Sequence, residues 1–161
     1  MTTWLIVLAG VSAIATTLVG GVFLAFSDFI MRSLSRARPP AGVEVMQTIN
    51  REVFRFVFMT LFLGMAAVSL VMAIYAVMAL SGAAQLLIVA ASLIYLIGVF
   101  GVTVSRNVPL NDALAGKDTD ATTTQNYWTE VYLPRWTFWN TVRTFACVLS
   151  ATLLIAGIAA D

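Results

Sequence analysis

The chain has 161 residues, of which 60% are hydrophobic and 11% charged, and its formal net charge is +1. A soluble domain carries about 25% charged residues, so this composition indicates a protein that lies in a lipid bilayer. No basic stripe is present, and we expect no nucleic-acid partner. With one cysteine and no histidine, the chain excludes an internal disulfide, a histidine-ligated haem, a histidine-rich zinc or copper site and a Ser-His-Asp triad.

Four apolar segments are long enough to cross a membrane. A bilayer core of roughly 30 Å requires about 20 helical residues, and the segments cover residues 4–27, 54–80, 83–105 and 136–160. The first segment lacks the basic start and the short apolar run of a signal peptide, so we expect it to be retained. We predict one domain over residues 1–161, an all-α antiparallel four-helix bundle in the membrane with helices extended on the cytoplasmic side.

Two long connections, residues 28–53 and 106–135, alternate with a short hairpin near Ser81 and Gly82. All nine Lys and Arg residues lie in or next to the long connections. The positive-inside rule therefore predicts that both long loops are cytoplasmic and both termini are outside. We expect an integral protein of the plasma (inner) membrane.

The long connections are predicted to be partly helical. Charged residues recur at helical spacing from Asp28 to Arg36, so we expect the first span to continue as a helix until the prolines at 39 and 40 end it. A second helix from residue 43 is predicted to run straight into the second span. In the other connection, Asn107 is the predicted N-cap of a short helix.

One charged residue, Arg143, lies inside the fourth apolar segment. An arginine at a bilayer centre costs roughly 2.5–3.5 kcal/mol on insertion scales, so its presence requires a reason. Helical spacing puts Trp136, Asn140 and Arg143 on one face, with Trp139 beside them. If that face points inward, the guanidinium needs an acid partner or an anionic ligand. Alternatively, Arg143 snorkels to headgroups or ties helices together.

Carboxamide side chains flank the other spans at the same predicted end of the bundle. They are Gln47, Asn50, Asn107 and Asn111, and the carboxylates predicted on this side include Asp28, Glu52 and Glu130. Each carboxamide alone suits a helix cap or a helix bridge. Their convergence at one end of the bundle favours a binding site.

Small and apolar residues in the spans are predicted to serve packing. Glycines at 20, 21, 64, 98 and 101 are expected to let helices approach closely. The methionines and phenylalanines of the second span are expected to contact lipid or neighbouring helices rather than to form a site. Cys147 is expected to be a small buried side chain.

Four fragments in chain order carry a family resemblance. They are "FLAFSDFIMRSL" (23–34), "VMQTINREVFRFVFMTLFLG" (45–64), "NVPLNDALA" (107–115) and "YLPRWTFWNTVRT" (132–144). Together they resemble the anthrone oxygenase-like family of small four-span membrane proteins, most of which have no assigned function. The activity that names this family is oxidation of an anthrone to an anthraquinone by O2 without metal or flavin. The resemblance implies a site at Gln47, Asn50, Asn107, Asn111, Trp136, Asn140 and Arg143.

Two functions remain open. In the first, the protein is a cofactor-independent oxygenase without metal. Arg143, Asn140 and Asn107 would stabilise an oxyanion, and Glu52 (or Asp112 or Glu130) would be the base. The tryptophans at 128, 136 and 139 would form the walls of a flat slot, and Gln47, Asn50 and Asn111 would bind the substrate. In the second, a non-enzymatic membrane protein binds a lipid, a quinone or another small hydrophobic molecule for assembly or transport. Transport through four helices would require a homo-oligomer. Both predict a lipid bilayer and a small hydrophobic ligand as partners.

Overall fold

The structure is a computed structural model that describes residues 1–55 and 57–160, apart from the side chains of residues 39 and 55. Residue 56, inside the predicted second span, and residue 161 lie outside the described residues. The described chain is helical almost throughout and contains no strand. This confirms the predicted all-α fold.

Four helices are long and apolar enough to cross a membrane, which indicates an integral membrane protein. The first consists of α1 (Thr3–Ala25), the π-helical segment η1 (Phe26–Ile30) and α2 (Met31–Arg36), and the second is α4 (Val57–Ala79). The third joins α5 (Gly82–Ile94), η3 (Tyr95–Gly101), η4 (Thr103–Asn107) and α6 (Val108–Ala115). The fourth joins α7 (Thr122–Tyr127), η5 (Trp128–Tyr132) and α8 (Leu133–Ala159).

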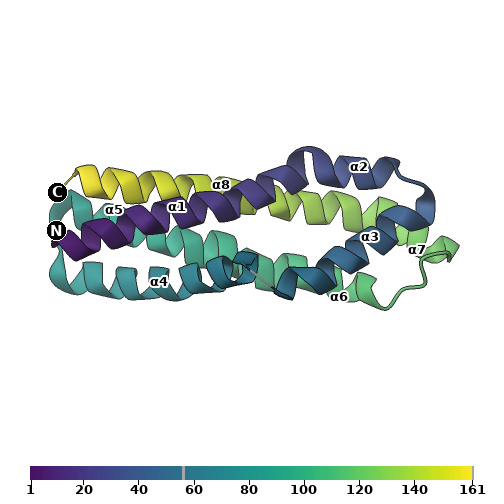
Figure 1. The fold of residues 1–161 in the computed structure, drawn as a ribbon, viewed down its shortest axis with the longest axis horizontal. Coiled ribbons are helices and arrows are strands. Elements are labelled where there is room, and N and C mark those ends of the chain that lie inside the picture. The colour runs from purple at the N-terminus through teal and green to yellow at the C-terminus, as the bar shows by residue number, and fades with distance from the viewer. Residues whose placement is uncertain (56, 161) are drawn as a thin grey trace.

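The helices form an elongated antiparallel bundle in which α8 packs against both α1 and α5, and α5 packs against α4. Both termini and the α4–α5 connection lie at one end, whereas the α2–α3 and α6–α7 connections lie at the other (Figure 1). A helix of 34 residues is about 51 Å long, well above the roughly 30 Å of a hydrocarbon core. The helices therefore extend beyond the thickness that the bilayer covers.

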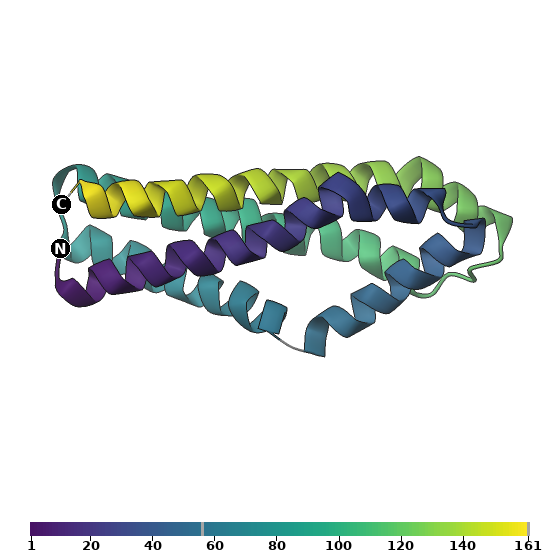
Figure 2. The same ribbon diagram turned by 45° about the horizontal axis from the view of Figure 1, so that its top comes forward.

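The structure differs from the sequence-based expectation at two helix junctions. Helix α3 (Pro39–Glu52) does not run straight into the second span, because it ends in the tight 3₁₀ turn η2 (Val53–Arg55). As a result, α3 and α4 meet at an angle and diverge from α1 (Figure 2). The third helix has no break at Asn107, whose side chain makes no capping hydrogen bond. The N-cap prediction for Asn107 is therefore wrong.

Glycines allow close contact at some of the predicted positions. A Cβ atom on Gly20 would lie 2.8 Å from the Cβ of Cys147, and one on Gly98 would lie 2.8 Å from the Cβ of Ala146. These contacts bring α1 and η3 against α8, where Cys147 is buried as expected. Gly21 and Gly64 have no such neighbour within 4 Å, so the packing prediction is wrong for them within this chain.

We expect Gly20→Val to lower the stability of the protein by about 1–3 kcal/mol, because the added methyl groups overpack the α1–α8 contact. Gly21→Val is the matched control, since its Cβ has open space and the position is exposed. Thermal unfolding of both variants in detergent measures the difference. Equal melting temperatures would contradict the close approach of the two helices.

Candidate functional site

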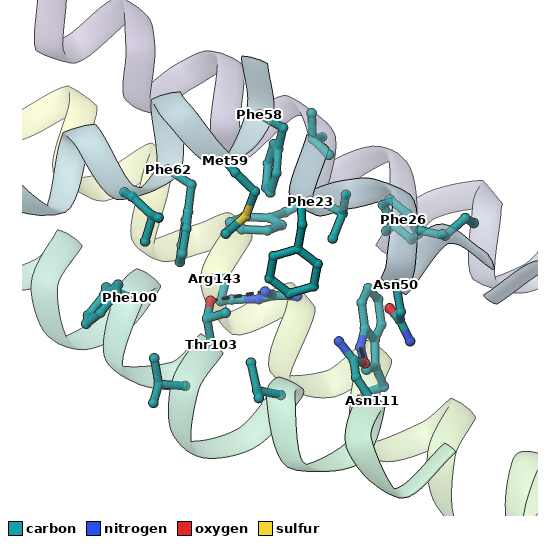
Figure 3. A pocket seen from close by; sticks show the side chains of 18 of the residues that line it. Phe23, Phe26, Asn50, Phe58, Met59, Phe62, Phe100, Thr103, Asn111 and Arg143 are labelled. Carbon is teal, nitrogen blue, oxygen red and sulfur yellow. Dashed lines mark hydrogen bonds between the residues drawn. The ribbon is translucent and has the colours of Figure 1, made fainter. Parts of the chain in front are cut away.

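A pocket of about 210 Å³ lies where α3 and α4 diverge, between these helices and the remaining three long helices (Figure 3). Its walls are mainly aromatic: phenylalanines 23, 26, 54, 58, 62 and 100 line it, with Met59 and Trp136. The sequence-based expectation treated Phe58, Met59 and Phe62 as packing or lipid contacts. The signal that could have found them is the four-residue spacing of Phe58 and Phe62, which places their rings on one face of α4.

Arg143 of α8 lines this pocket and is only 5% exposed. Its Nη1 donates to the hydroxyl oxygen of Thr103 (3.1 Å), and its Nη2 donates to Oδ1 of Asn140 (2.8 Å). The guanidinium carbon lies 4.1 Å from the centre of the Phe23 ring. Among the described residues, Nε has no hydrogen-bond partner and no carboxylate forms an ion pair with the guanidinium. A positive charge is therefore buried beside aromatic rings, and none of the residues that the structure describes supplies a negative partner.

Asn140 holds Arg143 in place and does not line the pocket. Its Nδ2 donates to the carbonyl oxygen of Phe23 (2.6 Å) and to the hydroxyl of Ser27 (2.7 Å). These bonds turn its Oδ1 toward Arg143, and Ser27 also hydrogen-bonds Thr141 at 2.9 Å. The network joins α8 to the junction of α1 and η1, so Asn140 is a positioning residue for the guanidinium.

On the α6 side of the pocket, Asn111 lines the wall together with Trp136. Oδ1 of Asn111 accepts hydrogen bonds from the Tyr132 hydroxyl (2.8 Å) and from Nε1 of Trp136 (2.8 Å). Behind them, buried Asn107 donates from Nδ2 to the carbonyl oxygen of Trp136 (3.2 Å), and its Oδ1 has no partner in the described part of the chain. Asn107 thus supports the α8 backbone from behind the pocket wall.

The remaining predicted site residues are divided. Asn50 lines the pocket and lies close to Tyr132, and its buried Nδ2 makes no hydrogen bond of regular geometry among the described residues. Gln47 does not line it, because its Nε2 donates to the carbonyl oxygens of Leu114 and Lys117 at the end of α6. Trp139 lies outside the lining, with Arg106 over its ring at 4.9 Å. Glu52 is exposed and is also outside the lining.

The other predicted aromatic and acidic residues also lie away from the pocket. Trp128 stacks on Tyr132 with ring centres 5.2 Å apart and does not contribute to the lining. The carboxylates of Asp28, Asp112 and Glu130 are exposed. Within residues 1–55 and 57–160, no three Cys, Asp or Glu side chains gather as metal ligands would. The wall that could hold a flat molecule is thus made of phenylalanine and Trp136.

Three π-helical segments supply hydroxyl groups to the polar network, none of which was among the predicted site residues. Ser27 belongs to η1, Thr103 to η4 and Tyr132 to η5. Their partners are Asn140, Arg143 and Asn111, respectively. A π-helical turn changes the rotation of a helix locally and occurs often at functional sites. A pattern based on regular helical spacing does not predict which hydroxyls such a turn directs inward.

The sequence model of the family described as anthrone oxygenase matches residues 51–153, well over half of the chain. The chain belongs to the anthrone oxygenase family. This confirms the resemblance drawn from the four fragments. The matched range contains Asn111, Trp136 and Arg143, whereas Phe23 and Asn50 lie before it. No curated protein and no solved structure matches the chain.

We expect Asn140→Ala to destabilise the protein by about 1–3 kcal/mol, because it leaves a buried N–H of Arg143 without its acceptor. Asn126→Ala is the matched control, since Asn126 is exposed and its side chain forms no hydrogen bond with the residues that the structure describes. Thermal unfolding in detergent compares the two variants. An Asn140 variant as stable as the Asn126 variant would contradict the positioning role.

Proposed function

We propose that this membrane protein is a cofactor-independent oxygenase that oxidises a lipophilic anthrone- or phenol-like aromatic compound with O2. The observation that carries the proposal is the buried Arg143 guanidinium, which has no carboxylate partner among the described residues and lines an aromatic pocket. Arginine keeps its proton, and an unpaired buried charge is costly. An oxyanion that forms in the pocket would therefore be strongly stabilised.

In addition to this charge, the proposed oxidation of an anthrone needs a proton acceptor and O2. Loss of a proton from the methylene group of an anthrone gives an anthrolate, whose negative charge lies largely on oxygen. The anthrolate passes one electron to O2, and the resulting carbon radical and superoxide combine to a peroxide. After protonation, the hydroperoxide loses water and leaves a carbonyl group. One anthrone and one O2 thus give one anthraquinone and one water, with no outside reductant.

The apolar residues at the rim of the pocket support the proposal of a lipophilic substrate. Val22, Phe54, Leu63 and Val104 line the pocket and are at the same time exposed, and all four are apolar. The polar lining residues Asn50, Thr103 and Asn111 are half-buried, and Arg143 is buried. A compound dissolved in the bilayer would meet hydrocarbon at the rim and polar groups farther in.

The roles of the individual residues follow from their positions. We assign the oxyanion contact to Arg143, its orientation to Asn140 and Thr103, and support of the Trp136 backbone to Asn107. Glu52 is our candidate base, since it follows the lining residue Asn50 at the end of α3 and precedes the lining residue Val53. An exposed carboxylate there would release the proton to water.

We expect Arg143→Ala to lower kcat about 100- to 1,000-fold, because one preorganised donor to a developing oxyanion has an effect of this size. The assay supplies the purified protein with an anthrone and follows O2 uptake and quinone absorbance. Arg106→Ala is the matched control, since Arg106 is exposed and contacts Trp139 outside the pocket. A wild-type rate equal to that of protein-free detergent would refute the oxygenase proposal for this substrate class.

The same assay tests the base. Loss of a general base lowers the rate by about 100- to 10,000-fold, so Glu52→Gln should show a loss in that range. Glu44→Gln, a change of another exposed carboxylate on the same helix α3, is the control. Full activity of the Glu52 variant would remove Glu52 as the base and leave the role of Arg143 intact.

A binding function remains the second candidate, favoured by the absence of any carboxylate among the described lining residues. A pocket with donors and no base suits a protein that holds a quinone or a lipid without changing it. In that case, Arg143→Ala would weaken ligand binding while the wild type shows no turnover. A homo-oligomer that serves transport stays a prediction under this alternative.

We further propose the membrane orientation given by the charges, with residues 28–53 and 106–135 in the cytoplasm of the plasma (inner) membrane. In a Cys147→Ala background, we expect Ser81→Cys to react with an impermeant maleimide added to intact cells. Thr123→Cys, in the α6–α7 end of the bundle, should react only after the cells are lysed. The opposite pattern would reverse the orientation.

A further inference from the structure

The amide of Asn111 is locked in one orientation. Its Oδ1 accepts from Nε1 of Trp136 and from the hydroxyl of Tyr132, both at 2.8 Å. An indole N–H is only ever a donor, so the atom facing Trp136 has to be the amide oxygen. The chemistry of the partners therefore assigns the two ends of this amide.

The other end of the amide faces the pocket. Nδ2 of Asn111 has no hydrogen bond to any residue that the structure describes, although its oxygen has two. Figure 3 shows the Asn111 nitrogen turned toward the pocket space beside Phe23. Asn111 is half-buried and belongs to the lining. A free N–H donor is thus directed into an aromatic pocket.

The groups that lock the amide are themselves rigid. Tyr132 is fully buried and Trp136 is 5% exposed. The rings of Tyr132 and Trp136 are stacked with centres 6.4 Å apart, and the ring of Trp128 is also stacked with Tyr132, with centres 5.2 Å apart. Because Tyr132 and Trp136 are tightly packed, they keep the Asn111 donor in its direction before a ligand binds. This preorganisation lowers the entropy cost of binding.

This donor is separate from the guanidinium. Asn111 lies on α6 and is oriented by Tyr132 and Trp136, whereas Arg143 lies on α8 and is oriented by Thr103 and Asn140. In Figure 3 the guanidinium lies by Phe23 and Thr103, while Asn111 lies farther along the pocket, near Asn50. One pocket therefore presents donors at two places along an apolar wall.

We propose that the pocket selects a flat aromatic ligand that carries acceptor oxygens at two separate positions, one bound by Arg143 and the other by the locked Nδ2 of Asn111. Asn111 is then a specificity-determining residue, and Tyr132 and Trp136 are its positioning residues. The inference rests on the proposed function only in that the same pocket holds the ligand. It concerns binding, and it holds whether or not the ligand is oxidised.

The test compares three flat tricyclic probes that differ in their oxygens: anthraquinone with two, anthrone with one and anthracene with none. Tritiated probes are bound under anaerobic conditions to the purified full-length protein in detergent, with protein-free micelles as the partition blank. We expect the affinity of the wild type to fall in the order anthraquinone, anthrone, anthracene. A hydrogen bond from a neutral donor contributes about three- to tenfold, which sets the expected step between the two ketones.

Variants of the protein assign each difference in affinity between the probes to a residue. Asn111→Leu should abolish the preference for anthraquinone over anthrone and keep the preference of both over anthracene. Should this variant not fold, Asn111→Asp retains an acceptor for Tyr132 and Trp136, lacks the N–H donor, and should lose the same preference. Tyr132→Phe keeps the donor but loosens it, so a partial loss is expected. Tyr127→Phe is the matched control, because Tyr127 packs on Tyr132 at 6.4 Å and its hydroxyl makes no recorded bond.

Equal affinities of all three probes for the wild type, absence of binding, or a folded Asn111 variant with an unchanged preference would each overturn the inference. Its failure differs from failure of the proposed function. A protein that discriminates the probes but consumes no O2 keeps the two-donor pocket and loses the oxygenase activity. A protein that oxidises anthrone with an unchanged preference after Asn111→Leu keeps the activity and loses the inference.

Discussion

Burial of the Arg143 guanidinium is the interaction on which the polar half of the bundle depends. The charge is taken out of water at a cost of several kcal/mol. Part of that cost is offset by hydrogen bonds to Thr103 and Asn140 and by the Phe23 ring at 4.1 Å, since a desolvated cation–π contact contributes about 2 kcal/mol. These partners come from the first, third and fourth long helices. The charge is tolerated only when those three helices meet around it.

The angle between α3 and α4 leaves a pocket beside the Arg143 guanidinium (Figure 2). Had α3 continued straight into α4, its side chains would have packed along the bundle and filled the space. The 3₁₀ turn instead leaves α3 and α4 at an angle to each other (Figure 2), and phenylalanines of α4 line the resulting pocket. The π-helical segments carry Ser27, Thr103 and Tyr132, whose hydroxyls hydrogen-bond Asn140, Arg143 and Asn111, respectively. Irregular turns thus contribute to an apolar pocket with polar groups at its inner surface.

Family and geometry contribute different parts of the functional argument. Membership in the anthrone oxygenase family suggests the class of reaction, but one fold hosts many functions, so membership alone does not assign residues. The residues come from geometry: a buried cation, a locked amide donor and aromatic walls. These features suit a ligand that is flat, apolar and oxygenated. They also explain how a chain without histidine and with no lining carboxylate among its described residues would favour an electron-rich anion.

The spans, their antiparallel order and the common helix face of Trp136, Asn140 and Arg143 follow from the sequence alone, which left open whether that face points inward. These depend on local properties, namely apolar length, charge distribution and helical spacing around Arg143. Only the tertiary structure decided which groups meet there. Glu52 lies outside the pocket, and Asn107 supports a backbone carbonyl instead of a helix end. Phenylalanines and Trp136 form the wall, whereas Trp128 and Trp139 lie outside it. The reason is physical: a 3₁₀ turn or a π-helical turn changes the number of residues per turn, so it rotates every residue beyond it about the helix axis and changes which side chains face the pocket.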